Sequence, residues 1–309
     1  MRWDRLIGTI IHPASTQLDL FLDSRAVVLA NEVVAALLSR NTPNALECLR
    51  ELERANPDHP SLPALAALTR ALARWQVREG DVLAIADAVA RLQSEVEPAV
   101  GSALGAEARP FLNRFYRELA AAATGLAYDR EHPTTHRAWL CLHADEFAES
   151  EQAALSIPNW KEIPEVLHWL TVARHRLHGL EAARTSLFWL AWREPQRVPD
   201  VIAELGDELL DRDWRAFEFA CDWDDMPEHE LPAWFPAWYV LEHPAVGNEL
   251  ADAPFPDGAA PAAVSLLLRL FALERQGNSK TLIAQRERLR NLNQRFFALY
   301  MLRRAVLHS

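Results

Sequence analysis

The chain has 309 residues, of which half are apolar, and it carries a formal net charge of −11 at pH 7. Because phosphate binding needs a cationic face, this charge disfavours a nucleic-acid role for the protein as a whole. The longest apolar segment, 262–273, is interrupted by Arg269 and is too short to cross a bilayer. The three cysteines form no CxxC pair and indicate no disulfide framework. We therefore expect a soluble protein of the reducing cytoplasm, with no cofactor and no membrane insertion.

Apolar residues recur at helical spacing in nearly every segment between prolines, and the chain has only 10 glycines. Alanine and leucine, which are abundant here, are strong helix formers. The sequence therefore predicts about a dozen helices and no strand, with a break at 98–110 and a loop at 251–261. In chain order, the expected helices cover 23–40, 42–56, 61–77, 81–92, 111–125, 132–147, 149–157, 163–179, 180–194, 198–223 (one interrupted helix or two), a segment from Pro232, 261–275, 279–289 and 291–307.

In two of these segments, a small residue is followed by leucines four and seven positions later and by a proline twelve positions later. The two sets are Ala45, Leu49, Leu52 and Pro57, and Ala183, Leu187, Leu190 and Pro195. The small residue lets the second helix of a hairpin approach the first, and the leucines fill the seam. The proline then prevents the helix from continuing.

With this spacing, the sequence resembles the tetratricopeptide repeat group over residues 24–57 and 163–195, about a fifth of the chain. It departs from that pattern in two respects. The glycine expected inside the first helix of each repeat is missing, and the tryptophan near its start has no clear counterpart. The resemblance implies a binding scaffold without catalysis, and it implies no particular ligand.

The predicted fold is all-α, with antiparallel helical hairpins stacked as a tetratricopeptide-like solenoid or array of about a dozen helices. Three regions are expected: an N-terminal helical array at 1–100, a Trp-rich central array at 101–250, and C-terminal helices at 251–309. The last region continues from the others, so a single elongated domain is the alternative. The expected function is a non-catalytic scaffold that binds a protein or peptide partner, because such arrays bind through a long concave face.

Nine of the eleven tryptophans lie between residues 139 and 238. Trp234 and Trp238 are four residues apart and share a helix face, with Tyr239 beside them. Core packing is the favoured interpretation, since Trp fills the space between misaligned helices. The alternative is an aromatic groove for a partner. Its candidate residues are Trp189, Trp192, Trp234, Trp238 and Tyr239.

A metal-dependent helical enzyme is the rival from another class of function. His175 and His178 lie one helical turn apart, with His168 two turns back and Glu165 before it. Further carboxylates follow in the segment from Asp222 and Asp224 to Glu230, and clustered carboxylates can hold a divalent cation. The structural alternatives are an acidic turn that caps the next helix and histidines that suit a helix C-terminus. Cys141 and His143, with His136 nearby, are weaker candidates for a catalytic nucleophile and its base. Residues two apart on a helix point in different directions, so the two side chains would not meet.

Charge is distributed unevenly towards the C-terminus. Residues 204–230 contain eleven Asp or Glu against two Arg, whereas residues from 275 onwards contain eight Lys or Arg against Glu287 alone. The favoured interpretation is a solvated basic face that pairs in part with the acidic segment. The alternative is a patch that binds an acidic partner or nucleic acid. Arg286 and Arg290, four residues apart, are its candidate residues.

Overall fold

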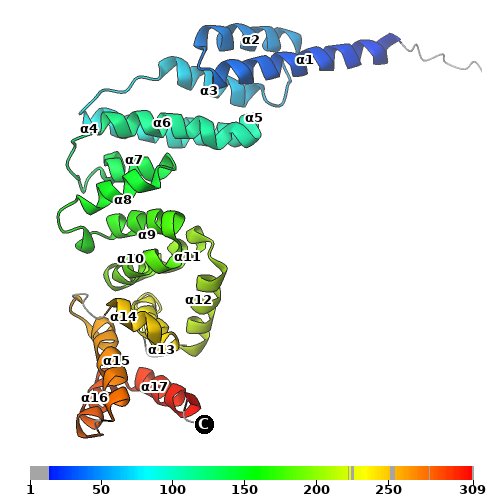
Figure 1. The fold of residues 1–309 in the computed structure, drawn as a ribbon. Coiled ribbons are helices and arrows are strands. Elements are labelled where there is room, and N and C mark those ends of the chain that lie inside the picture. Colours follow the sequence, from blue (N-terminus) through cyan, green and yellow to red (C-terminus); the bar gives the residue numbers. More distant parts are fainter. Residues whose placement is uncertain (1–13, 222, 224–225, 251–254, 278, 308–309) are drawn as a thin grey trace, which may run out of the picture. The chain divides into compact units, whose positions relative to one another are not determined.

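The computed structural model of the chain describes residues 14–221, 223, 226–250, 255–277 and 279–307 (Figure 1). Over these residues the chain folds into α-helices joined by short turns, with no strand, so the predicted all-α helical array is confirmed. None of the described helices combines the length and the apolar character needed to cross a membrane. The chain divides into two compact units, residues 1–144 and 145–309. The regions expected at 1–100, 101–250 and 251–309 stay predictions, as does the tetratricopeptide-like stacking.

The first unit begins with a long helix that packs along the second in a hairpin. The Asn41 side chain accepts a hydrogen bond from the Asn44 N–H at 3.2 Å and caps α2, one residue before the expected cap, Thr42. Asp81 caps α4 through the Ala84 N–H at 3.0 Å, as its position before an apolar run predicts. The helices of this unit are α1 (Ala14–Leu38), α2 (Thr42–Ala55), α3 (Leu62–Arg74), α4 (Val82–Arg91), α5 (Glu97–Leu104), α6 (Ala108–Ala122) and α7 (Arg137–His143).

The break expected at 98–110 is wrong in extent. Pro98 lies in the first turn of α5, where its missing N–H has no helical partner to lose. A π-helical turn, Leu92–Val96, joins α4 to α5. The interruption is a single 3-10 turn, Gly105–Glu107, and it starts at a glycine with φ of 51°. Gly and Pro therefore mark a corner between two helices here instead of a loop.

The second unit contains α8 to α17. Gly206, with φ of 64°, ends α11 and separates it from α12, so the segment 198–223 forms two helices. Pro236 does not kink a helix, because a 3-10 turn at Leu231–Trp234 comes first and places this proline in the first turn of α13. The helices are α8 (Phe147–Leu155), α9 (Pro164–His178), α10 (Leu180–Arg193), α11 (Val198–Leu205), α12 (Glu208–Ala220), α13 (Phe235–Glu242), α14 (Gly247–Leu250), α15 (Ala259–Gln276), α16 (Ser279–Leu292) and α17 (Gln294–Leu307).

The repeated spacing corresponds to two helix pairs, α1 with α2 and α9 with α10. Ala45 and Ala183 are both fully buried. Asn56 and Glu194, the residues before the two prolines, adopt nearly the same extended conformation, with φ of −151° and −147°. Each donates its N–H to a leucine carbonyl one turn back, at 2.8 Å. The proline imposes this geometry, because it excludes the helical conformation at the residue before it.

Candidate binding surface

The aromatic residues considered for a groove lie in the core of the second unit. Trp189, Trp234, Trp238 and Tyr239 are between 5 and 6% exposed, and Trp192 is partly buried with its ring 5.5 Å from that of Phe255. These side chains cannot anchor a partner without leaving the core. Burial therefore supports the core interpretation and corrects their assignment as binding residues.

Phe235 lies at the centre of the ring cluster that contains Trp238 and Tyr239. Its ring centre lies between 5.1 and 6.4 Å from five others, mostly edge to face, and these rings come from α10, α12 and α13. The five are Phe188, Trp214, Phe217, Trp238 and Tyr239. Large rings in such arrangements fill the irregular space between three helices and gain from each contact.

The histidines considered for a metal site bond three different carboxylates. The contacts are His168 with Glu204 at 2.6 Å, His175 with Asp207 at 3.2 Å, and His178 with Glu151 at 3.8 Å. Glu165 contacts Arg197 instead of His168. Within the described residues, no group of three or more His, Cys, Asp or Glu could hold a metal ion. Asp222 and Asp224 lie outside the described residues.

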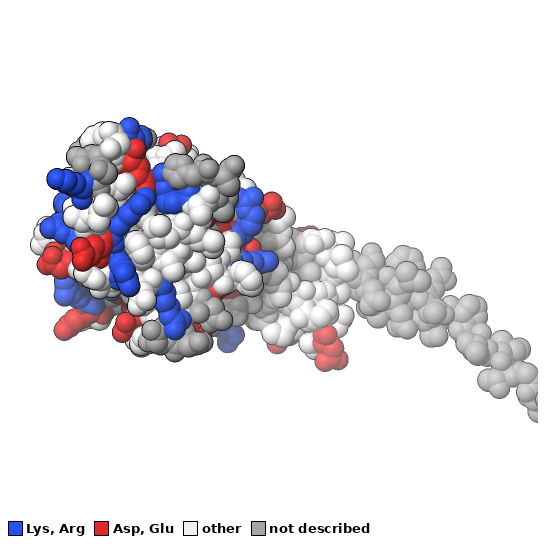
Figure 2. Space-filling view, turned by 90° about the horizontal axis from the view of Figure 1, so that it is seen from below, with Lys and Arg blue, Asp and Glu red and all other residues white. Residues whose placement is uncertain are grey.

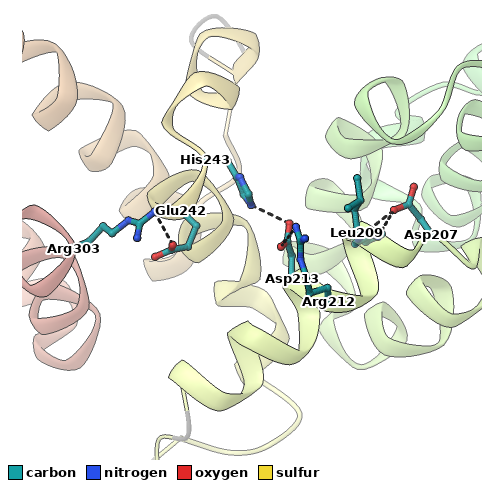
Figure 3. Close-up of polar contacts among 8 residues, drawn as sticks. Asp207, Leu209, Arg212, Asp213, Glu242, His243 and Arg303 are labelled. Carbon is teal, nitrogen blue, oxygen red and sulfur yellow. Dashed lines mark hydrogen bonds and ion pairs between the residues drawn. The ribbon is translucent and has the colours of Figure 1, made fainter. Parts of the chain in front are cut away.

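The acidic segment 204–230 is used within the second unit to start and attach α12 (Figure 3). Asp207 accepts hydrogen bonds from the N–H groups of Leu209 and Leu210, both at 3.0 Å, and so caps α12. Burial alone would raise the pKa of Asp207, but these N–H groups and His175 outweigh it and lower the pKa. Further along α12, Asp213 contacts His243 at 2.9 Å and ties this helix to the end of α13.

In the first unit, Cys141 is fully buried on α7, where a substrate cannot reach it. His136 accepts a hydrogen bond from the Ala138 N–H at 3.2 Å and caps the same helix, and burial lowers the pKa of its imidazole to about 4. His143 bonds the Trp139 carbonyl at 2.9 Å. His136 caps α7 and His143 contacts a main-chain carbonyl, which indicates structural roles for these two histidines.

The basic C-terminal helices contain a partly buried ion cluster around Glu274. Tyr300 donates its O–H to this carboxylate at 2.5 Å, while Arg286 and Arg304 contact it at 3.1 and 2.8 Å. Burial and the bond to Glu274 raise the pKa of Tyr300 to about 12. Burial alone would lower the pKa of Arg286, but Tyr300 and Glu274 outweigh it and raise the pKa.

Arg286 is partly buried and engaged by Glu274 and Tyr300, and its assignment to a partner-binding patch stays a prediction. Arg303 contacts Glu242 on α13 at 3.1 Å (Figure 3). Arg286 and Arg304 pair with Glu274, and Arg303 pairs with Glu242. The pairing expected between the basic helices and the acidic segment 204–230 stays a prediction, because Asp222, Asp224 and Asp225 lie outside the described residues. Arg290 is exposed on α16, as a binding residue would have to be.

Two other arginines approach one hollow from neighbouring helices. Arg269 on α15 and Arg288 on α16 are exposed and line a hollow of about 620 Å³, which we call the α15–α16 hollow. Asp257 also lines it. In the described part of the chain, neither arginine forms an ion pair. Figure 2 shows Lys and Arg side chains bordering uncharged surface on the face seen from below.

Arg269 was not predicted as a site residue, because in the sequence it stands out only as an interruption of an apolar segment. A signal was present: Ala262, Ser265 and Arg269, spaced by three and four residues, all line the hollow and define one face of α15. On α16, Asn291 and Leu292 lie three and four residues after Arg288 and also line the hollow. A comparison of these two helix faces would have indicated that Arg269 and Arg288 lie at the same surface. Searches of protein-family models, curated proteins and solved structures found no match to this chain.

Proposed function

We propose that this protein is a non-catalytic helical scaffold that binds an acidic segment of a partner protein at the α15–α16 hollow. One observation carries the proposal: two exposed guanidinium groups, Arg269 and Arg288, line the same hollow from different helices. Guanidinium groups are planar and present paired N–H donors that match a carboxylate. Two of them from separate helices can hold neighbouring acidic side chains in a fixed register.

The charge distribution supports an anionic partner. The chain as a whole is acidic, yet the residues from 275 onwards carry eight Lys or Arg against Glu287 alone. A local positive field of this kind steers an acidic segment to one face and speeds association. The acidic remainder of the chain repels other anionic surfaces and so limits where such a partner can bind.

The lining of the hollow favours a peptide over a nucleic acid. Phe255, Leu266 and Leu292 contribute apolar surface beside the two arginines. A peptide in which apolar and acidic residues alternate can contact both kinds of surface, because each position along a peptide can carry a different side chain. A nucleic acid presents evenly spaced phosphates, and its binding needs a cationic groove that tracks them. The expected partner segment is therefore acidic and partly apolar.

A binding measurement with a defined probe tests the proposal. A short fluorescent peptide of alternating Glu and Leu is titrated with the protein and followed by anisotropy. Reversing both charges with Arg269→Glu and Arg288→Glu is expected to weaken binding by at least roughly tenfold, and added salt should weaken the wild-type complex. The matched control reverses Arg50 and Arg54, two exposed arginines four residues apart on α2, and should leave binding unchanged.

Several outcomes would contradict the proposal. Equal loss of binding in the α2 control would mean that only net charge matters. An oligonucleotide that binds as tightly as the peptide would replace the acidic peptide with nucleic acid as the ligand. The wild-type protein could instead associate with itself in competition with the peptide, and the Arg269 and Arg288 reversals could abolish this association. That result would mean that a second copy of the chain occupies the α15–α16 hollow.

A further inference from the structure

A second hollow lies apart from the α15–α16 hollow, on the side of α15 that faces α14 and α17. It has a volume of about 500 Å³, within the range of small-molecule sites in proteins. Leu268, Phe271 and Ala272 on α15 line it, together with Pro244 and Ala245 from the turn before α14. The three α15 side chains are only partly buried, so apolar surface stays uncovered there.

The polar end of this hollow is cationic. Glu274 lines it, but this carboxylate already accepts hydrogen bonds from Tyr300 and Arg286 and forms an ion pair with Arg304. Two arginines against one carboxylate leave the cluster with a net positive charge. Arg304 belongs to the cluster and lines the hollow, and Arg275, exposed at its rim, adds a second positive charge. The field therefore favours an anionic group and disfavours a cationic one.

The wall depends on a glycine. A methyl group at position 247 would lie 2.5 Å from Cδ2 of Leu268, a distance that forces the leucine to move. Gly247 therefore lets the chain after α13 pass close to the Leu268 side chain, which lines the hollow. The close approach gives the apolar part a defined wall.

We propose that this hollow binds a small carboxylic acid with an apolar body. The carboxylate lies against Arg275 and Arg304, and the apolar body lies along Leu268 and Phe271. A carboxylate matches the paired donors of a guanidinium group, and the uncovered apolar wall supplies the remaining binding energy. This site is separate from the α15–α16 hollow, and its occupancy does not depend on the function proposed above.

Calorimetric titration of the full-length protein with octanoate tests the assignment, with octanol as the neutral ligand of the same length. Octanoate is expected to bind with a stoichiometry of one, and octanol is expected to bind at least roughly tenfold more weakly, because it loses the charged hydrogen bonds. Arg275→Gln should weaken octanoate by a similar factor. This arginine is exposed, so its replacement leaves the core intact.

A blocking variant provides the matched control. Ala272→Trp fills this hollow and is expected to abolish octanoate binding, whereas Ala262→Trp, on the same helix but lining the α15–α16 hollow, should retain it. Circular dichroism and thermal unfolding check that both variants fold. Octanoate binding that survives Ala272→Trp, or octanol binding of equal strength, would overturn the proposal. Tighter binding of octyl phosphate than of octanoate would overturn the choice of a carboxylate.

Discussion

His136 occupies the N-cap of α7, where its Nδ1 accepts a hydrogen bond from the Ala138 N–H at 3.2 Å and its ring is buried. Only the neutral imidazole can accept this bond, and a cation at a helix N-terminus is opposed by the helix dipole. The substitution His136→Asn keeps a side-chain oxygen that can cap the helix but removes the titrating ring. It therefore isolates the effect of protonation from the effect of capping.

The size and sign of this effect follow from the pKa of His136. Burial lowers it from 6.5 to about 4, which corresponds to roughly 3 kcal/mol of free energy. Between these two pH values the unfolded chain binds a proton that the folded chain excludes. The free energy of unfolding therefore falls as the pH falls through this window, and the full contribution is present above pH 6.5.

Urea denaturation of the wild type and of His136→Asn, at a pH above the window and at one near its lower end, measures this difference. The wild type is expected to lose more of its free energy of unfolding than the variant, by on the order of 3 kcal/mol. Other titrating groups are common to both proteins and cancel in the comparison. Equal acid-induced losses would contradict this prediction, because they would show that the folded protein binds the proton at His136 as readily as the unfolded chain does.

The second unit allows three further tests by urea denaturation, followed by fluorescence of the tryptophans, most of which lie in this unit. Glu274→Gln should lower the free energy of unfolding by about 2–3 kcal/mol, because it leaves two partly buried guanidinium groups without their carboxylate. Tyr300→Phe removes one hydrogen bond and should lower it by about 1 kcal/mol. Equal losses in the two variants would contradict the role given to the charge of Glu274. Ala183→Leu should cost about 1–3 kcal/mol by overpacking the fully buried α9–α10 contact, whereas Ala182→Leu, at a partly exposed position, should be tolerated. Asp207→Ala should lower the free energy of unfolding by about 1 kcal/mol at neutral pH, because the cap of α12 is lost. The difference between wild type and variant should shrink as the pH falls below 3.8, since the pKa of Asp207 is lowered in the fold. A difference that does not change with pH would exclude the carboxylate as its source.

Features determined by neighbouring residues were predictable from the sequence. The ends of α2 and α10 follow from the prolines at 57 and 195, since each acts on the residue directly before it. The cap at Asp81 is equally local. A third helix end of the same kind, at His243 before Pro244, was missed, because no small residue and leucine pair precede it at the repeated spacing.

Features that depend on contacts between helices were not predictable. Helical spacing places Trp234 and Trp238 on one face but does not say whether other helices cover it, and here rings from α10 and α12 surround Phe235 beside them. The partner of Arg286 is Glu274, on the preceding helix, and not the more numerous carboxylates of 204–230. Two carboxylates of that segment have other partners: Asp207 caps α12, and Asp213 contacts His243.

Hydrogen–deuterium exchange with mass spectrometry shows whether an acidic partner segment binds at the α15–α16 hollow. The protein is compared with and without a saturating amount of the Glu–Leu peptide. Binding is expected to slow amide exchange in the segment 262–292, which contains the residues of α15 and α16 that line the hollow, and to leave α1, α2 and α3 unchanged. Slowed exchange confined to other helices, with 262–292 unchanged at saturation, would contradict the account.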